Sequence, residues 1–303
     1  MIDFTDLPKK NKAYAGANGN KLSVIYNCEQ YMLKFPPVPK TNKEMSYTNS
    51  CVSEYIGSHI FNMVGIPAQE TLLGTYKIKG KEKIVVACKD FTSIGITLQD
   101  FASLKNQVID SDSNGYGTVL DDLIYTMENQ TALDVIELKT HFWDMFIIDA
   151  LIGNFDRHNG NWGFLYNAQT DELKLAPVFD CGSCLYPQAD DEMIKKILGN
   201  QSELEARIYV FPQSAIHDDG KKVNYFDYIS SLKNPDCNKA LKRMAKRIDI
   251  DKMCSMINDI ECLTDLQKDF YCKMLAERKT RIIDYPLQQL KKKERADRNK
   301  AAR

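Results

Sequence analysis

The chain has 303 residues, of which 44% are hydrophobic and 27% are charged, and its formal net charge is −1. Such values are ordinary for a soluble globular protein, and the length allows one large domain or two moderate ones. The near-neutral charge excludes a polycation that would bind nucleic acid with its whole surface. The chain begins without an apolar signal core, and no apolar run approaches membrane-spanning length. We therefore expect no transmembrane segment and a cytoplasmic location; secretion without a cleaved signal is the alternative.

The nine cysteines are odd in number and follow no regular framework. In a chain of this size they indicate reduced thiols in a cytosol-like compartment. Cys181 and Cys184 have the spacing of a redox motif, but no second such pair and no histidine pair completes a zinc site. We interpret them as incidental thiols.

The first ninety residues are predicted to form a small α+β lobe. β-prone runs alternate with turn residues, and one helical run carries apolar side chains at helical spacing before Gly65-Ile66-Pro67 ends it. The predicted elements are strands at 23–26, 30–35, 71–78 and 83–87 and a helix at 47–63.

The pattern becomes helical after residue 90 and predicts a larger, mainly helical lobe over residues 91–290. Its predicted helices lie at 98–106, 118–127, 133–152, 238–248, 251–257 and 263–283. Residues 110–117 are the most loop-like segment, and we expect a mobile surface loop there rather than a plain linker. Residues 291–303 hold seven basic and two acidic side chains. They are predicted to be a solvated, frayed tail, with weak contact to nucleic acid as the lesser possibility.

Three polar residues follow the pattern of a phosphoryl-transfer site. Asp156 stands five residues before Asn161, after an apolar helical run and ahead of a plausible hairpin, and Asp180 follows in an apolar strand. In kinases the first Asp is the catalytic base, whereas the Asn and the second Asp hold Mg²⁺ against the nucleotide phosphates. Metal and positioning supply most of the catalysis, because the transferred group carries dispersed negative charge. Two surface loops rich in turn residues are the alternative interpretation.

A kinase also needs a lysine for the α- and β-phosphates and a helix carboxylate that orients it. Lys34 ends a predicted strand, and Glu54 lies twenty residues later on the predicted helix. A lysine in such a place is otherwise a snorkelling surface residue. Together with the two downstream aspartates, the pair predicts a phosphate-binding function.

Four residues that precede the first hairpin predict a phosphate-covering loop. Glycines in this segment allow the backbone to bend toward phosphates, although the segment matches neither the Walker pattern nor the full Gly-rich loop of protein kinases. His158 lies two residues after Asp156, where it either contacts the nucleotide or braces the loop. The predicted loop residues are Gly16, Ala17, Asn18 and Gly19.

In their order along the chain, these motifs resemble the HipA-like serine/threonine kinases. The resemblance runs from about residue 10 to at least residue 230, and its motifs are specific. They read Ala-Gly-Ala-Asn, Met-Leu-Lys-Phe-Pro, Ser-Glu-Tyr with Val-Gly-Ile-Pro, Gly-Asn-Phe-Asp-Arg-His-Asn-Gly-Asn-Trp-Gly and Leu-Ala-Pro-Val-Phe-Asp.

The resemblance implies a bilobal, protein-kinase-like α+β fold with ATP and Mg²⁺ as cofactors and a protein that offers a Ser or Thr hydroxyl as substrate. It assigns Lys34 to the phosphates, Asp156 to the base, and Asn161 and Asp180 to the metal. It also implies an adenine-facing hinge at Lys89 and Asp90. A serine that the family phosphorylates before its Gly-rich loop is replaced by Ala13 or Tyr14, which puts inherited self-inhibition in doubt.

Two other classes of function stay open from the sequence. The Asp-Arg-His-x-x-Asn motif also resembles that of phosphoinositide kinases, so a lipid or small-molecule phosphotransferase is one alternative. A catalytically silent, kinase-like binding module is the other, although the presence of every expected charged residue argues against it.

Overall fold

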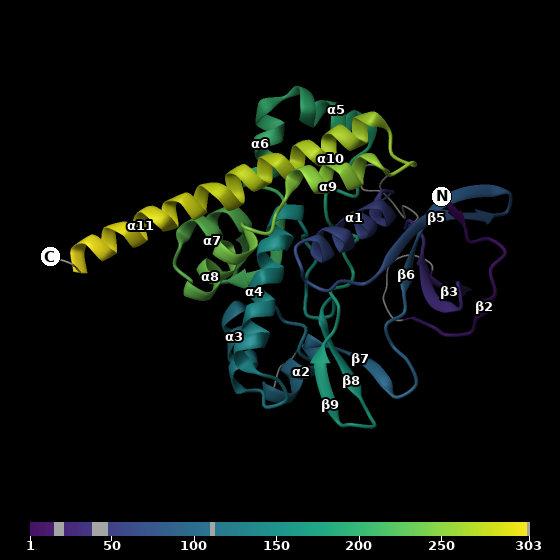
Figure 1. Cartoon of the computed structure of the whole chain (residues 1–303), viewed down its shortest axis with the longest axis horizontal. Helices are drawn as coiled ribbons and strands as arrows, with labels where there is room; N and C mark the ends of the chain where they lie inside the picture. Colours follow the sequence, from purple (N-terminus) through teal and green to yellow (C-terminus); the bar gives the residue numbers. More distant parts are fainter. Residues whose placement is uncertain (15–20, 38–47, 110–112, 302–303) are drawn as a thin grey trace.

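A computed structural model describes residues 1–14, 21–37, 48–109 and 113–301. A strand-rich N-terminal part stands beside a mainly helical remainder, and we call these parts the N-lobe and the C-lobe (Figure 1). The bilobal α+β fold predicted from the sequence is confirmed. Within the described residues, no helix is both long and apolar enough to cross a membrane.

The N-lobe contains a six-stranded sheet in the order β1-β5-β6-β4-β3-β2. All neighbouring strands are antiparallel except the pair β1–β5. Asn27 and Cys28 both have positive φ and form the two-residue turn between β3 and β4, a geometry that suits a tight hairpin. The strands are β1 (Ile2–Asp3), β2 (Lys9–Lys10), β3 (Lys21–Tyr26), β4 (Glu29–Lys34), β5 (Thr71–Ile78) and β6 (Lys81–Lys89).

Alternation along β4 decides which way Lys34 points. Tyr31, Leu33 and Phe35 are buried in an apolar cluster on one face of the sheet. Met32 and Lys34 therefore belong to the other face, because successive side chains of a strand point to opposite sides. Helix α1 (Ser50–Met63) packs against β5 and β6, and its side chains join the core on that face.

Helix α1 also belongs to the core of the C-lobe. Ile56, Ile60 and Phe61 are fully buried in the large apolar cluster that continues into the C-lobe helices. Gly57 allows the close approach, since a Cβ at this position would lie 2.6 Å from the Cβ of Cys181. The helix that carries Glu54 is thereby fixed to both lobes.

The centre of the C-lobe is α4 (Val135–Ile152), which is buried on all sides over its last turns. The Asp134 side chain accepts the Glu137 N–H at its start, and Gly153 ends it in a left-handed conformation. The other helices are α2 (Phe101–Val108), α3 (Leu120–Asn129), α5 (Asp191–Gly199), α6 (Gln201–Tyr209), α7 (Tyr225–Ser231), α8 (Pro235–Met244), α9 (Ile250–Asn258), α10 (Asp265–Arg278), the π-helix η2 (Lys279–Asp284) and α11 (Tyr285–Ala301).

Two small sheets complete the C-lobe. Strands β7 (Ile96–Asp100), β8 (Gly163–Asn167) and β9 (Glu172–Leu175) form an antiparallel sheet, and β10 (Gln213–Asp218) pairs with β11 (Lys221–Asn224). The β8–β9 hairpin stands where the sequence predicted one after Asn161.

Three sequence predictions are wrong. Residues 98–100 belong to β7 rather than to a helix, because they pair with β8 and Asp100 caps the helix that follows. Asp180 does not lie in a strand: Val178 makes a single bridge to Ala68, and Asp180 adopts a positive φ of 58°.

The basic end is helical as far as Ala301 rather than frayed, since the buried Leu290 and an ion pair between Lys242 and Glu294 hold α11 to the body. Figure 1 shows α11 extending away from the two lobes.

A fully buried arginine fixes the end of α4 ahead of the site. The Arg278 guanidinium donates to the carbonyls of Ala150 and Leu151, which belong to the last turn of α4, and to the carbonyl of Arg207. Burial lowers the pKa of Arg278. Such a cation is favourable at the carboxyl end of a helix, where carbonyls lack partners and the helix dipole is negative.

Candidate active site

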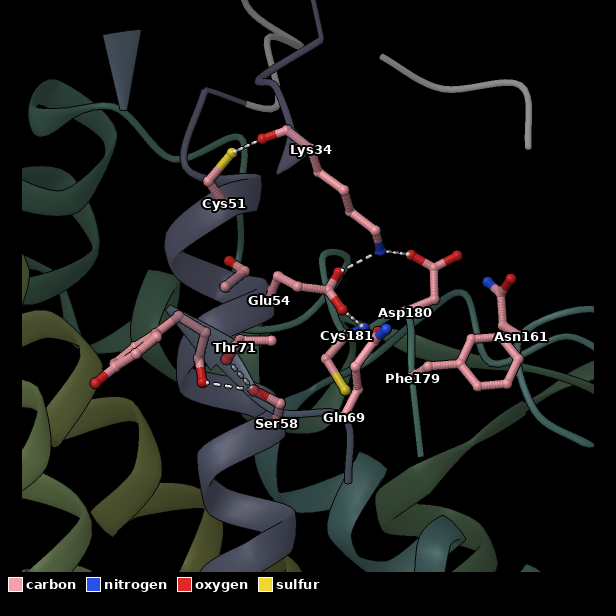
Figure 2. Close-up of polar contacts among 12 residues, drawn as sticks. Lys34, Cys51, Glu54, Ser58, Gln69, Thr71, Asn161, Phe179, Asp180 and Cys181 are labelled. Carbon is pink, nitrogen blue, oxygen red and sulfur yellow. Dashed lines mark hydrogen bonds and ion pairs between the residues drawn. The ribbon is translucent and has the colours of Figure 1, made fainter. Parts of the chain in front are cut away.

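Lys34, Glu54 and Asp180 come together between the lobes from three distant parts of the chain. The Lys34 Nζ lies 2.9 Å from Glu54 Oε2 and 2.9 Å from Asp180 Oδ1 (Figure 2). The side chains of Lys34 and Glu54 are 17% and 2% exposed, whereas that of Asp180 is 44% exposed. Within the cluster, the two side chains from the N-lobe are therefore largely buried, and the aspartate is the member most accessible to solvent.

The electrostatics of this cluster favour charged side chains. Burial alone would lower the pKa of Lys34, but the carboxylates of Asp180 and Glu54 outweigh burial and raise it well above its usual value. Conversely, the Lys34 ammonium lowers the pKa of Asp180, and its effect outweighs the partial burial of that carboxyl group. Lys34 and Asp180 thus stay ionised at neutral pH, as a phosphate-binding cation and a metal-binding carboxylate require.

Glu54 connects Lys34 to the segment that carries Asp180. Its Oε2 accepts a hydrogen bond from Lys34, and its Oε1 accepts the backbone N–H of Cys181 at 3.1 Å (Figure 2). One buried carboxylate on α1 therefore sets both the lysine and the backbone next to Asp180.

Residues 154–161, which we call the catalytic loop because the sequence predicts the catalytic base there, follow α4 and its C-cap Gly153. The Asn154 side chain accepts the backbone N–H of Asp156 at 3.1 Å and donates to Asp149 at 2.9 Å. At the other end of the loop, the Asn161 amide nitrogen donates to the Asp156 carbonyl at 2.8 Å. This contact uses the amide nitrogen of Asn161, so its amide oxygen is the atom with the right chemistry for a cation.

Asp156 has the opposite electrostatic environment from Asp180. Burial raises the pKa of its carboxyl group, and the nearby charge of Asp180 adds to the rise, while His158 and the Ser183 hydroxyl act in the other direction. A raised pKa makes a carboxylate a stronger base. The two aspartates are thereby suited to different tasks.

Arg157, which the sequence analysis overlooked, joins the two loops of the site. Its NH1 donates to the Asn161 carbonyl at 2.7 Å and to the Phe179 carbonyl, and its NH2 contacts the Cys181 Sγ at 3.4 Å. Its Nε and NH2 pair with Asp149 on α4 at 3.0 and 3.3 Å. This buried cation therefore fixes the backbone beside Asn161 and Asp180 with one planar group.

A sequence signal for this pair existed. Asp149 is a carboxylate within the apolar run of α4, and a buried carboxylate needs a cation or hydrogen-bond donors. Arg157 is the nearest arginine after it, eight residues along the chain.

The predicted hinge is engaged with protein partners in this structure. Lys89 pairs with Glu29 and Glu70, and the Asp90 carboxylate accepts hydrogen bonds from Lys12, Tyr14, Gln30 and Thr92. Phe91, the next residue, lies with its ring centre 5.9 Å from that of Phe179. A nucleotide contact at Lys89 and Asp90 stays a prediction.

Two further predictions concern the loops. Gly16, Ala17, Asn18 and Gly19 lie outside the described residues. His158 braces the catalytic loop, because its Nδ1 accepts the backbone N–H of Gly160 at 3.0 Å; its contact with a nucleotide stays a prediction.

The thiols near the site are unsuited to redox chemistry. All nine cysteines of the chain are described and free. Burial raises the pKa of Cys181 to about 12 and that of Cys184 well above its usual value. Because the thiolate is the reactive form, the interpretation as incidental thiols fits the structure.

The donor set at Asn161 and Asp180 fits Mg²⁺ in the presence of phosphates. Over the described parts of the chain, no group of three or more His, Cys, Asp or Glu side chains could hold a metal by itself. Mg²⁺ typically uses one or two carboxylates together with substrate phosphates and water. An amide oxygen and one carboxylate therefore suit a metal that binds together with a nucleotide.

Comparisons with known proteins agree with this geometry. Residues 12–257 match the model of the HipA-like C-terminal domain. The serine/threonine-protein kinase CtkA of Helicobacter pylori strain J99 is 53% identical over 285 residues, which cover 93% of this chain and 86% of CtkA. The crystal structure of a proinflammatory kinase CtkA from H. pylori superposes with a TM-score of 0.90 at 52% identity, covering 95% of this chain and 97% of that one.

A more distant structure shows the fold alone. HipA of Shewanella oneidensis MR-1, solved in a complex with HipB and operator DNA, has a TM-score of 0.54 at 15% identity; the match covers 93% of this chain and 67% of that one.

The chain belongs to the family of proteins with a HipA-like C-terminal domain, and it is a kinase. The resemblance to HipA-like kinases predicted from the sequence motifs is thereby confirmed.

Replacing Arg157 with Lys should lower the rate of transfer at least about tenfold, because lysine cannot hold Asp149 and two backbone carbonyls with one planar group. The matched control is Arg243→Lys, since Arg243 also pairs with an α4 aspartate, Asp144, at 2.6 Å. Transfer rates and chemical denaturation of both variants distinguish the roles. Equal losses of transfer in the two variants would contradict a positioning role for Arg157.

The pair Lys34 and Glu54 should act as one unit. Lys34→Met should raise the ATP requirement and lower turnover with the fold retained, and Glu54→Gln should harm the wild type yet add little to the Lys34→Met variant. Transfer rates of both single variants and the double variant measure the coupling. Lys174→Met, which removes an exposed lysine paired with Glu172, serves as the control. Fully additive losses would refute the pair.

Proposed function

We propose that this chain is an ATP- and Mg²⁺-dependent protein serine/threonine kinase with Asp156 as its catalytic base. The proposal rests on the Lys34–Glu54–Asp180 cluster, in which Asp180 lies close enough to Asp156 of the catalytic loop to affect its pKa. A cation held by two carboxylates, with one of them partly exposed, is the arrangement that binds nucleotide phosphates and a metal in kinases.

Each residue has one task in this proposal. Lys34 binds the α- and β-phosphates, and Glu54 holds Lys34 in place. Asp156 takes the proton of the Ser or Thr hydroxyl while that oxygen bonds to the γ-phosphorus, and the bond from the γ-phosphorus to the bridging oxygen breaks to release ADP. Asn161 and Asp180 would hold Mg²⁺, which supplies charge neutralisation when bound.

The comparisons support a protein acceptor rather than a lipid or a small molecule, because the relative at 53% identity is named a serine/threonine-protein kinase. A silent binding module would not need Asp156, a carboxyl group whose pKa burial raises. Incubation with labelled ATP, Mg²⁺ and protein, lipid or aminoglycoside acceptors tests all three possibilities. Label on a lipid or an aminoglycoside alone would refute the protein acceptor.

Asp156→Asn should reduce transfer by roughly 10²–10⁴-fold with the fold and ATP binding retained, because the amide keeps the size of the side chain but cannot accept the proton. Burial already disfavours the charged carboxyl, so the neutral amide should leave the melting temperature unchanged or higher.

The pH profile provides the control for Asp156. A base must be deprotonated, so wild-type transfer should fall as the pH drops through the raised pKa of Asp156. The residual rate of Asp156→Asn should lack this acidic limb. Near-wild-type turnover of the variant, or the same acidic limb in both enzymes, would remove Asp156 from this role.

Asp180→Ala should weaken Mg²⁺-dependent nucleotide binding far more than metal-free binding, because the variant loses a carboxylate ligand. Calorimetry with ATP, with and without Mg²⁺, measures the difference. Asp171→Ala is the matched control, since Asp171 in the β8–β9 turn has a φ of 53°, close to the 58° of Asp180. Equal losses with and without metal would speak against a ligand role.

A further inference from the structure

A second polar network, outside the residues that the proposed reaction uses, fixes residues 113–117 onto the catalytic loop. The Asn159 side chain is buried within the catalytic loop, and its amide nitrogen donates to the carbonyls of Gly115 at 2.7 Å and Gly117 at 2.9 Å. The Asn159 carbonyl in turn accepts the backbone N–H of Ala102 at the start of α2. This part of the predicted mobile loop is therefore tied to the catalytic loop.

A buried lysine reinforces the attachment. The Nζ of Lys105, which is fully buried, donates to the Gly117 carbonyl at 2.7 Å and pairs with Asp122 at 3.0 Å. Burying an ammonium group is unfavourable unless it is paired. Moving Gly117 away would leave the Lys105 ammonium without one of its two partners, so Lys105 stabilises the observed position of the loop. Gly115 is required as well, because it has a φ of +80° and a Cβ there would lie 2.0 Å from the Ala102 carbonyl oxygen.

The network places one aromatic ring against the catalytic loop. The Tyr116 hydroxyl donates to Asp100 Oδ2 at 3.1 Å, and the ring lies beside Gly160. A Cβ at Gly160 would lie 3.1 Å from an atom of the Tyr116 ring and from one of the His158 ring, so both rings pack closely on the stretch between Asp156 and Asn161. Tyr116 nevertheless stays 54% exposed.

We propose that Tyr116 is a specificity-determining contact for the protein substrate, holding the segment that presents the Ser or Thr hydroxyl to Asp156. The inference rests on the proposed function. A rigidly held, half-exposed tyrosine offers a large amphipathic contact at low entropic cost. Its contacts Asp100 and Gly160 both belong to the C-lobe. The predicted phosphate residues Lys34 and Glu54 come from the N-lobe, which favours the acceptor over the nucleotide as the ligand of Tyr116.

The test compares Tyr116→Ala with Tyr125→Ala, because Tyr125 on α3 is also 54% exposed. Casein, myelin basic protein and histone are offered as acceptors, and the best of them is used at saturating ATP. Tyr116→Ala should raise the KM for the acceptor about tenfold, while the KM for ATP rises no more than about twofold. Tyr116→Phe keeps the ring and should retain most of the acceptor affinity, and Tyr125→Ala should behave as the wild type.

Each other outcome overturns the inference. A rise in the KM for ATP alone would assign Tyr116 to the nucleotide. An unchanged acceptor KM, or an equal rise in Tyr125→Ala, would leave Tyr116 without a specific role while the proposed function stands. A wild-type enzyme that hydrolyses ATP but labels none of the three proteins would refute the protein acceptor, and the inference with it.

Discussion

The buried guanidinium of Arg157 is the interaction on which the two loops of the site depend. Asp149 on α4 neutralises its charge, and the remaining donors bind backbone carbonyls at Asn161 and Phe179. Although burial disfavours the charge, the Asp149 carboxylate outweighs it and raises the pKa of Arg157, so the group stays a cation. Removing one partner of such a buried pair costs about 3–5 kcal/mol, because the other charge is left without compensation. The core helix thus determines where Asn161 and Asp180 can lie.

Charge differentiates two aspartates that lie on neighbouring loops. Lys34 lowers the pKa of Asp180 and keeps it an anion, whereas burial raises the pKa of Asp156. Pairs of carboxyl groups whose surroundings push their pKa values apart are typical of acid–base sites. Asp156 is suited to accept a proton, and Asp180 to hold a cation.

The position of α1 determines whether Lys34 and the Asp180 segment are held together. Glu54 accepts hydrogen bonds from Lys34 and from the Cys181 backbone with its two oxygens, and Gly57 one turn later packs on Cys181. A displacement of α1 would therefore break the contact to Lys34 and the contact to the Asp180 segment together. The large core that α1 shares with the C-lobe opposes such a displacement.

The sequence by itself determined the residue types and spacings of the predicted reactive groups. Asp156, Asn161, Asp180, Lys34 and Glu54 follow a pattern that the chemistry of phosphoryl transfer demands. Local periodicity located four strands and α1 in the N-lobe and six helices of the C-lobe, but it did not locate α5, α6 and α7. Each motif and each apolar period lies within a short stretch of the chain, so a linear pattern reveals it.

Tertiary structure alone decided how those groups are held. Arg157 binds the Phe179 carbonyl 22 residues further along the chain, and Lys105 binds the Gly117 carbonyl 12 residues further along. No local pattern predicts which carbonyl a buried cation will bind. Distant contacts also accompany two wrong predictions: residues 98–100 form a strand through pairing with β8, and Asp180, which pairs with Lys34, lies outside any strand. Contacts between residues far apart in the sequence override local propensity at these positions, because the backbone hydrogen bonds to β8 and the charge of Lys34 come from outside the local segment.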